Sequence, residues 1–114
     1  MNGFYLNIGL WHANTQNEMM VARACAAVEA VGIRIKRIAL VRKRDEEPSL
    51  VIHAETLLDR KTTAEEVLHA ANILDQDCIA MFWRGSGDDA GVGELIGPRA
   101  DAWGAFDARF FHFL

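Results

Sequence analysis

The chain has 114 residues, a formal net charge of −4 and a pI near 5.5, with 51% hydrophobic and 25% charged residues. This length and composition are typical of one globular domain, residues 1–114, and exclude a fibrous or low-complexity chain. The acidic balance argues against binding to nucleic acid or to an anionic membrane surface, because both need a positively charged surface. No apolar stretch reaches the roughly 18 residues that a membrane span requires.

Cys25 and Cys78 are the only two cysteines. Neither lies in a CxxC or Cys/His spacing that would suggest a zinc site or a redox pair. Both have apolar neighbours, which is typical of buried, unreactive thiols. Residues 1–11 lack the basic segment and continuous apolar run of a signal peptide. The sequence therefore predicts a cytoplasmic protein with no metal and no cofactor.

The first half of the chain predicts a strand, a helix and a hairpin. Apolar side chains occupy every second position of residues 4–10, which indicates a strand with one apolar face. Thr15 and Glu18 form a capping box that predicts a helix to about residue 31, with Gly32 just beyond its end. Residues 33–40 are expected to form an edge strand, paired with residues 50–55 across a polar turn.

The edge strand has two further features. Its apolar alternation changes phase near Lys36 and Arg37, which predicts a β-bulge there. Six of the 12 basic residues lie within residues 34–44, and they indicate either a phosphate-binding strip or an edge protected against aggregation. The acidic residues 45–47 that follow would oppose a polyanion, so the sequence argues against nucleic acid as a partner.

The second half begins with another capping box, Thr63 with Glu66 or Thr62 with Glu65, which predicts a helix to residue 74. Its expected buried residues are Ala64, Val67, Leu68, Ala71 and Leu74. The apolar residues 79–83 predict a central strand, which a glycine-rich turn connects to a return strand at residues 92–96. A short helix carrying Trp103 and a final strand at residues 109–114 complete the expected elements.

This element order predicts an α+β fold: a ferredoxin-like βαββαβ arrangement with extra C-terminal strands and two helices on one face of a mainly antiparallel sheet. The other sheet face is then open and unusually apolar. Such a face is seldom left in water, so the C-terminal aromatic segment, a second subunit or a ligand is expected to cover it.

The open face also collects the candidate ligand or interface residues. The expected aromatic walls are Tyr5, Trp11, Phe82 and Trp103, and the expected polar groups are Asn7, His53, Arg84 and His112. His12, beside Trp11 on a loop between a strand and a helix, is a further candidate. A histidine beside an amide and a carboxylate can transfer protons, although the same residues also suit a hydrogen-bonded polar pair in an interface.

Other motifs do not point to catalysis. Residues 85–90 fit a GxGxxA pattern, but too little chain follows for a dinucleotide-binding unit, and a glycine-rich hairpin turn explains them better. Asp88 and Asp89 have no third oxygen ligand at a recognisable spacing, so no metal site is assigned. Ser86 has no base at a recognisable spacing. No catalytic residue is therefore assigned.

Two functional hypotheses follow from the open face. The first is a small binding domain that associates with a second copy of itself through this face, as a homodimer. The second is a small-molecule-binding protein or small enzyme with an aromatic-lined pocket on the same face. Aromatic walls with a few polar groups occur in ligand sites and in interfaces alike. A flat face would favour the interface, whereas a concavity with a shifted histidine pKa would favour the pocket.

Overall fold

The computed structural model describes residues 1–10, 17–41, 48–85, 90–107 and 111, with side chains from residue 19 onward in the first helix. The elements are β1 (Asn2–Gly9), α1 (Asn17–Ala30), β2 (Arg34–Val41), β3 (Ser49–Thr56), α2 (Arg60–Ile73), β4 (Ile79–Trp83), β5 (Gly93–Ile96) and the 3-10 helix η1 (Ala100–Trp103).

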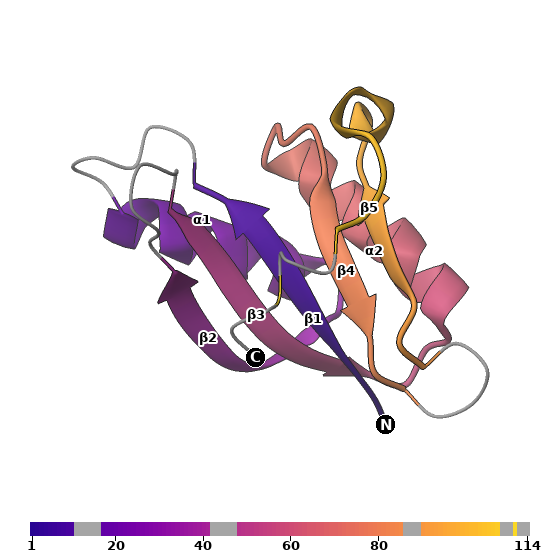
Figure 1. Ribbon diagram of the computed structural model, residues 1–114. Helices are drawn as coiled ribbons and strands as arrows, with labels where there is room; N and C mark the ends of the chain where they lie inside the picture. The colour runs from indigo at the N-terminus through magenta and orange to yellow at the C-terminus, as the bar shows by residue number, and fades with distance from the viewer. Residues whose placement is uncertain (11–16, 42–47, 86–89, 108–110, 112–114) are drawn as a thin grey trace.

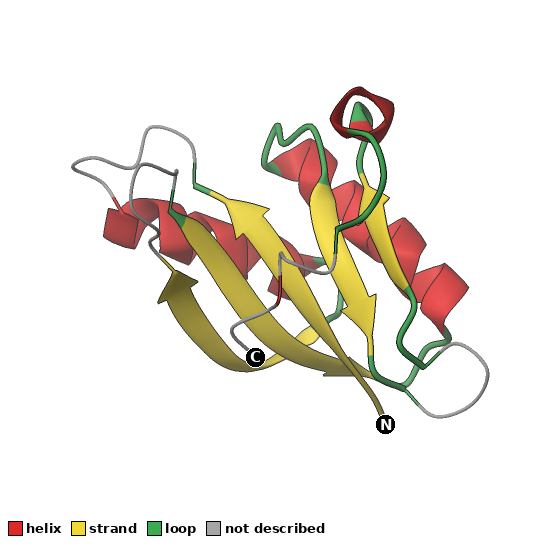
Figure 2. Ribbon diagram, viewed as in Figure 1, coloured by secondary structure: helices red, strands yellow, loops and turns green. Residues whose placement is uncertain are grey.

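The five strands form one sheet in the order β2-β3-β1-β4-β5, and every neighbouring pair is antiparallel. Both α-helices lie against the same face of this sheet (Figures 1 and 2). The prediction of an α+β fold with two helices on one side is confirmed. The five-strand order differs from the four-strand ferredoxin-like order, because β5 continues the sheet beyond β4.

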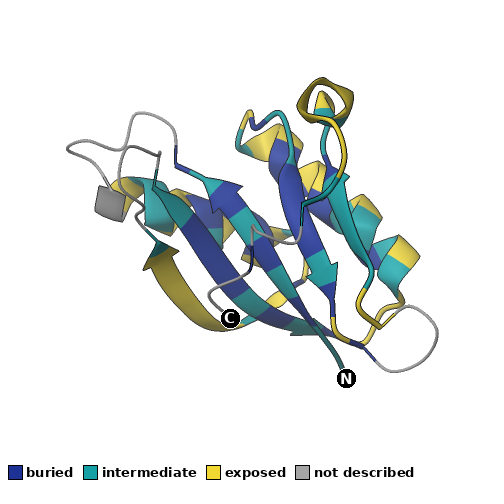
Figure 3. Ribbon diagram, viewed as in Figure 1, coloured by how far each residue is buried: buried dark blue, intermediate teal, exposed yellow. Residues whose placement is uncertain are grey.

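The main hydrophobic core lies between the sheet and the helices. The apolar alternation of β1 works as expected, since Phe4, Leu6 and Ile8 are each at most 1% exposed and face α1 and α2. Trp83 of β4 stacks on Phe4 with a ring-centroid distance of 5.5 Å. The central strands are therefore mostly buried, while β2 is largely exposed at the edge (Figure 3).

Two local predictions about the backbone are confirmed. The register of β2 against β3 shifts between Ile35 and Arg37, which is the predicted bulge. β4 and β5 form the predicted antiparallel hairpin. Gly91, in the turn between them, has a φ of +86°, a backbone conformation that residues other than glycine rarely adopt.

The predicted start of the second helix is wrong. Asp59 caps α2, because its side chain accepts a hydrogen bond from the Thr62 backbone N–H at 2.8 Å. Thr63 is not a cap: it is fully buried, and its hydroxyl donates to the Asp59 carbonyl oxygen at 2.7 Å. The helix consequently docks with Thr63 and Val67 inward, and Leu68 is 39% exposed instead of buried as predicted.

A second, smaller apolar cluster lies on the other face of the sheet. Phe111 and the half-buried Phe106 pack over Tyr5 and Phe82 of β1 and β4. Gly93 of β5 makes this possible, because a Cβ at that position would overlap the Phe106 ring. The C-terminal part of the chain, one of the three covers expected from the sequence, therefore covers part of the open face.

Several predictions fall outside the described residues. They concern Trp11, His12, His112, the capping box of the first helix, the polar turn at residues 42–47, Ser86, Asp88, Asp89 and the final strand at residues 109–114 apart from Phe111.

Candidate functional site

The strand register brings four side chains into one row across the open face. Arg37 of β2 lies opposite His53 of β3, which lies opposite Tyr5 of β1, which in turn lies opposite Phe82 of β4. Successive residues of a strand point to opposite faces, and the neighbours Phe4, Ala54 and Trp83 are buried on the helix side. All four side chains in this row are therefore on the open face.

An adjacent row is built around a glycine. Gly3 of β1 lies opposite Glu55 of β3, and on its other side its carbonyl oxygen accepts a hydrogen bond from the Arg84 backbone N–H at 2.9 Å. A Cβ on Gly3 would approach only the His53 Nε2 atom, at 3.9 Å, and the Ala54 carbonyl oxygen, at 4.0 Å. Among the described residues there is thus room for a methyl group at this position, in ordinary contact with the imidazole.

His53 is the central polar group of this face. Its ring is half-buried and stacks on Tyr5, with the centroids 4.7 Å apart and an interplanar angle of 22°. Its Nδ1 atom is buried and has no hydrogen-bond partner in the part of the chain that the structure describes. A buried polar atom without a partner is uncommon in folded proteins and requires an explanation.

The surroundings of His53 keep it neutral. Burial lowers the pKa of His53 below its ordinary value of 6.5, and the positive charges of Lys36, Arg37 and Arg84 lower it further. Glu55 acts in the opposite direction and raises this pKa, but burial and the cations outweigh it. At neutral pH the imidazole is therefore uncharged, with one nitrogen that can donate and one that can accept a hydrogen bond.

More positive than negative side chains surround the imidazole. Glu55 is only 16% exposed and forms ion pairs with Arg34 at 3.3 Å and with Lys36 at 3.8 Å. Arg37 and Arg84 form no ion pair with any carboxylate among the described residues. The Arg84 guanidinium instead lies 5.9 Å from the centroid of the Phe82 ring, which favours one position for its charge.

We call this region the His53 surface and define it by Gly3, Tyr5, Arg37, His53, Glu55 and Arg84. It contains three of the predicted site residues: Tyr5, His53 and Arg84. Phe82 lies at its border, where the C-terminal cover begins. Asn7 is on the same face of β1, opposite Val51 and Ala80, one row farther from Gly3.

Trp103 is the described member of the predicted site that does not join this group. Its Nε1–H donates to the Asp77 carboxylate at 2.9 Å, and the Arg99 side chain binds the same carboxylate. These donors hold the pKa of Asp77 below its ordinary value of 3.8. Asp77 precedes Phe82 by five residues, roughly 16 Å along an extended chain. Trp103 is 50% exposed, and its side chain is anchored at Asp77.

Sequence reasoning did not include Gly3, Arg37 and Glu55 among the site residues. The alternation of residues 50–55 had already placed Glu55 on the open face. The position of Arg37 depends on the bulge, because residues after the phase change point to the opposite face from those before it. The predicted bulge was thus the one signal in the sequence that bears on the face that Arg37 occupies. Placing Arg37 opposite His53 also required the exact register of β2 against β3.

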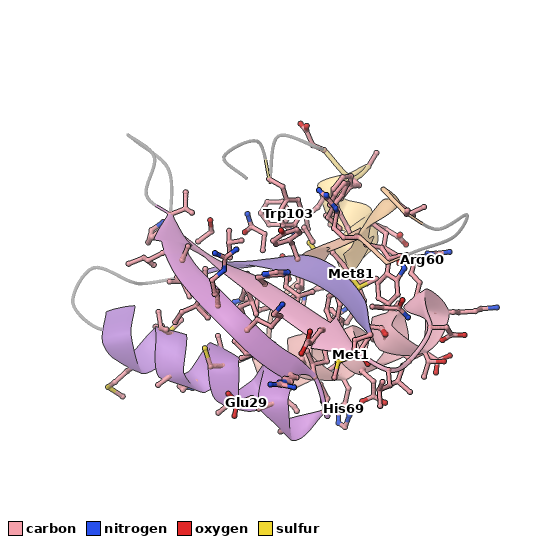
Figure 4. All side chains as sticks on the ribbon, turned by 90° about the horizontal axis from the view of Figure 1, so that it is seen from below. Met1, Glu29, Arg60, His69, Met81 and Trp103 are labelled. Carbon is pink, nitrogen blue, oxygen red and sulfur yellow. The ribbon has the colours of Figure 1, made fainter. Side chains whose placement is uncertain are left out.

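The described residues offer little for catalysis or metal binding. They contain no group of three or more metal-ligating side chains. Cys25 and Cys78 are half-buried and unpaired, and burial raises the pKa of each thiol. His69 is exposed on α2 and points away from the sheet (Figure 4). The arrangement at His53 can bind and orient a ligand, but it has no adjacent nucleophile.

One small cavity lies on the opposite side of the sheet. It has a volume of about 40 Å³ and lies among β1, α1 and the end of α2, beside Leu10, Met20 and Gln76. The Gln76 side chain donates to the Gly9 carbonyl oxygen at 3.1 Å at this place. Ligand sites for organic molecules are usually roughly ten times larger, so this cavity is a packing feature.

Neither described α-helix is long and apolar enough to cross a membrane. Comparison with known proteins gives no assignment: the chain matches no protein-family model, no curated protein and no solved structure.

Proposed function

We propose that this protein is a small binding domain and that it binds a small molecule through the His53 surface. The observation that carries the proposal is the half-buried imidazole of His53, whose buried Nδ1 atom has no hydrogen-bond partner among the described residues. A ligand bound beside the ring would enclose it more completely and would bond to the other nitrogen, Nε2, which lies next to Gly3. The lowered pKa of His53 and the absence of a side chain at its neighbour Gly3 also favour a ligand at this place.

Binding fits the residues better than catalysis does. General acid–base chemistry would need a second group that reaches the same substrate atoms. The nearest carboxylate, Glu55, is engaged by two cations, which favours its charged form over a proton-sharing role. His53 therefore serves to recognise the ligand, with Tyr5 and Phe82 as its apolar wall.

Self-association through the open face is the second candidate function. Phe106 and Phe82 are only half-buried even where the C-terminal segment covers the sheet. A second copy of the chain could remove their remaining apolar surface from water. This candidate predicts a homodimer that Tyr5→Lys dissociates, whereas the ligand-binding proposal predicts no change in mass beyond that of the ligand.

We also propose a ferredoxin-like arrangement for the first four strands, to which β5 is added, and a cytoplasmic location. The first proposal is supported by the position of β3 between β1 and β2 and of β1 between β3 and β4, since each strand–helix–strand unit is then split by another strand. The second is supported by two unpaired cysteines in a chain of this size.

The binding proposal is tested by NMR on the 15N-labelled full chain. We expect a library of small polar and aromatic compounds to yield ligands whose amide shift changes concentrate at Gly3, His53 and Arg84. His53→Gln should remove these shift changes, because glutamine cannot supply the same ring and nitrogens. His69→Gln, which changes an exposed histidine on α2, is the matched control and should leave them intact. Shift changes that concentrate elsewhere, or that survive His53→Gln, would contradict the proposal.

A further inference from the structure

The His53 surface and its neighbours on β2 are cationic on an acidic protein. Arg37 and Arg84 belong to this surface, Arg34 and Lys36 lie beside it, and Glu55 is the one carboxylate among these described residues. These five residues together carry a net charge of +3, whereas the whole chain carries −4. A patch of this sign on a protein of the opposite sign attracts anions locally.

Two of these cations are available to a ligand. Arg34 and Lys36 share Glu55, so their charge is partly compensated. Arg37 and Arg84 are exposed and pair with no carboxylate in the described part of the chain. Guanidinium groups bind phosphate and carboxylate with two parallel hydrogen bonds, which makes them the preferred cations for such groups.

The geometry lets both arginines reach one point. Arg37 is on β2 in the row of Tyr5, and Arg84 directly follows β4 in the row of Gly3. Three strand spacings and two residues along the strand therefore separate their backbones, roughly 16 Å. The space over Gly3 lies between them, with the His53 Nε2 atom at its side. Arginine side chains extending inward from both sides can therefore meet a group held over Gly3, and the imidazole can donate a third hydrogen bond.

We infer that the His53 surface binds the oxyanion of a small organic molecule, a phosphate or carboxylate group held over Gly3 between Arg37 and Arg84. The apolar part of this molecule lies along those parts of the half-buried Tyr5 and Phe82 that Phe106 and Phe111 leave accessible. This inference rests on the proposed function, because it uses the same surface, and it adds the chemical class of the ligand. Glu55 is the cross-strand neighbour of Gly3, but its carboxylate pairs with Arg34 and Lys36 of β2, on the side of β3 away from β1.

Binding of an oxyanion is coupled to the protonation of His53. The charged and titratable groups that face the imidazole are Tyr5 from β1, Lys36 and Arg37 from β2, Glu55 from β3 and Arg84 after β4. The bound anion offsets the three cations that lower the pKa of His53. Its pKa therefore rises on binding, and affinity increases as the pH falls through the raised pKa of the bound state.

Three probes test the inference on the 15N-labelled full chain: inorganic phosphate, acetate and phenol, which is uncharged. We expect phosphate or acetate to shift the amide resonances of Gly3, His53 and Arg84 in a saturable way. The same anion should raise the pKa of His53, which is measured from the chemical shifts of its ring protons as the pH is varied. Comparing phosphate with acetate identifies which oxyanion the surface prefers. Binding should weaken with added sodium chloride, as for any partly exposed ion pair.

Matched variants separate a specific site from general charge. Arg84→Gln and Arg37→Gln should each weaken binding about tenfold, as expected for one lost charge-assisted contact. Arg23→Gln removes an equal charge from the exposed surface of α1 and should leave the affinity within about twofold, because it contributes no contact. Equal losses from all three variants would overturn the inference, since they would show only a general charge effect.

The two proposals fail in different ways. Shift changes at Gly3, His53 and Arg84 with phenol but with neither anion would overturn the oxyanion inference and leave the proposed binding function standing. An absence of shift changes at these amides with all three probes, and with the wider library, would overturn both. A rise in the His53 pKa that Arg84→Gln does not diminish would also count against the inference.

Discussion

Phe111 provides the sharpest test of the packed cover on the open face. Its side chain is 7% exposed and contacts the rings of Phe106, Phe82 and Tyr5 at centroid distances of 6.0, 5.9 and 6.4 Å. Replacing a buried phenylalanine with alanine typically lowers the free energy of unfolding by about 3–5 kcal/mol. We expect the lower end, about 3 kcal/mol, because the second cluster is small and can partly collapse.

The measurement is urea unfolding followed by far-UV circular dichroism on the wild-type chain and Phe111→Ala. The native spectrum should be unchanged, because the main core between the sheet and the helices does not include Phe111. Leu57→Ala is the control: this leucine is 81% exposed, so its removal should alter the free energy of unfolding by at most about 0.5 kcal/mol. Phe111→Ala should also bind more of an apolar fluorescent dye than the wild-type chain does, because Tyr5 and Phe82 become more exposed.

The result that would refute this reasoning is equally specific. A loss below about 1 kcal/mol would resemble an ordinary surface substitution and would mean that Phe111 does not pack on the sheet. A loss of the expected size together with a changed native spectrum would show that the two apolar clusters depend on each other. In that case the helices would need the cover on the opposite face in order to dock.

Two further predictions concern single residues of the open face. Gly93→Ala should destabilise the fold by roughly 1–3 kcal/mol, because the added methyl group overlaps the Phe106 ring. Gly3→Ala places its methyl group at ordinary contact distances and should lower the free energy of unfolding clearly less in the same urea experiment. Equal losses would argue against the packing of Phe106. His53 should titrate below 6.5 by NMR, so stability contributed by its neutral form is complete above pH 6.5 and is lost as the pH falls through the lowered pKa. Arg84→Gln should raise this pKa, and an unchanged value would contradict the proximity of the two groups.

The sequence was sufficient for features that depend on neighbouring residues. The alternation of β1 sorted Phe4 from Tyr5 onto opposite faces, because strand side chains alternate with a period of two. The phase change in residues 33–40 located the bulge, and the glycines after residue 84 located the hairpin. Each of these signals is local, since backbone geometry fixes it within a few residues.

The second helix shows where local signals compete. Asp59, Thr62 and Thr63 are all residue types that can cap a helix. The choice of Asp59 shifts the start of the helix and turns Thr63 toward the sheet. Leu68 is then exposed, because the docking of the whole helix decides which of its apolar residues the core can accept. Sequence periodicity alone does not specify that orientation.

The candidate site was decided mainly by tertiary structure. His53 could be placed on the open face from its own strand, but Arg37 and Arg84 come from strands that precede and follow it by many residues. Only the strand order and register bring their charges to the same imidazole. The cover by Phe111 is likewise a contact between distant segments. Local chemistry thus determined the elements and their faces, whereas long-range pairing determined which side chains share a site.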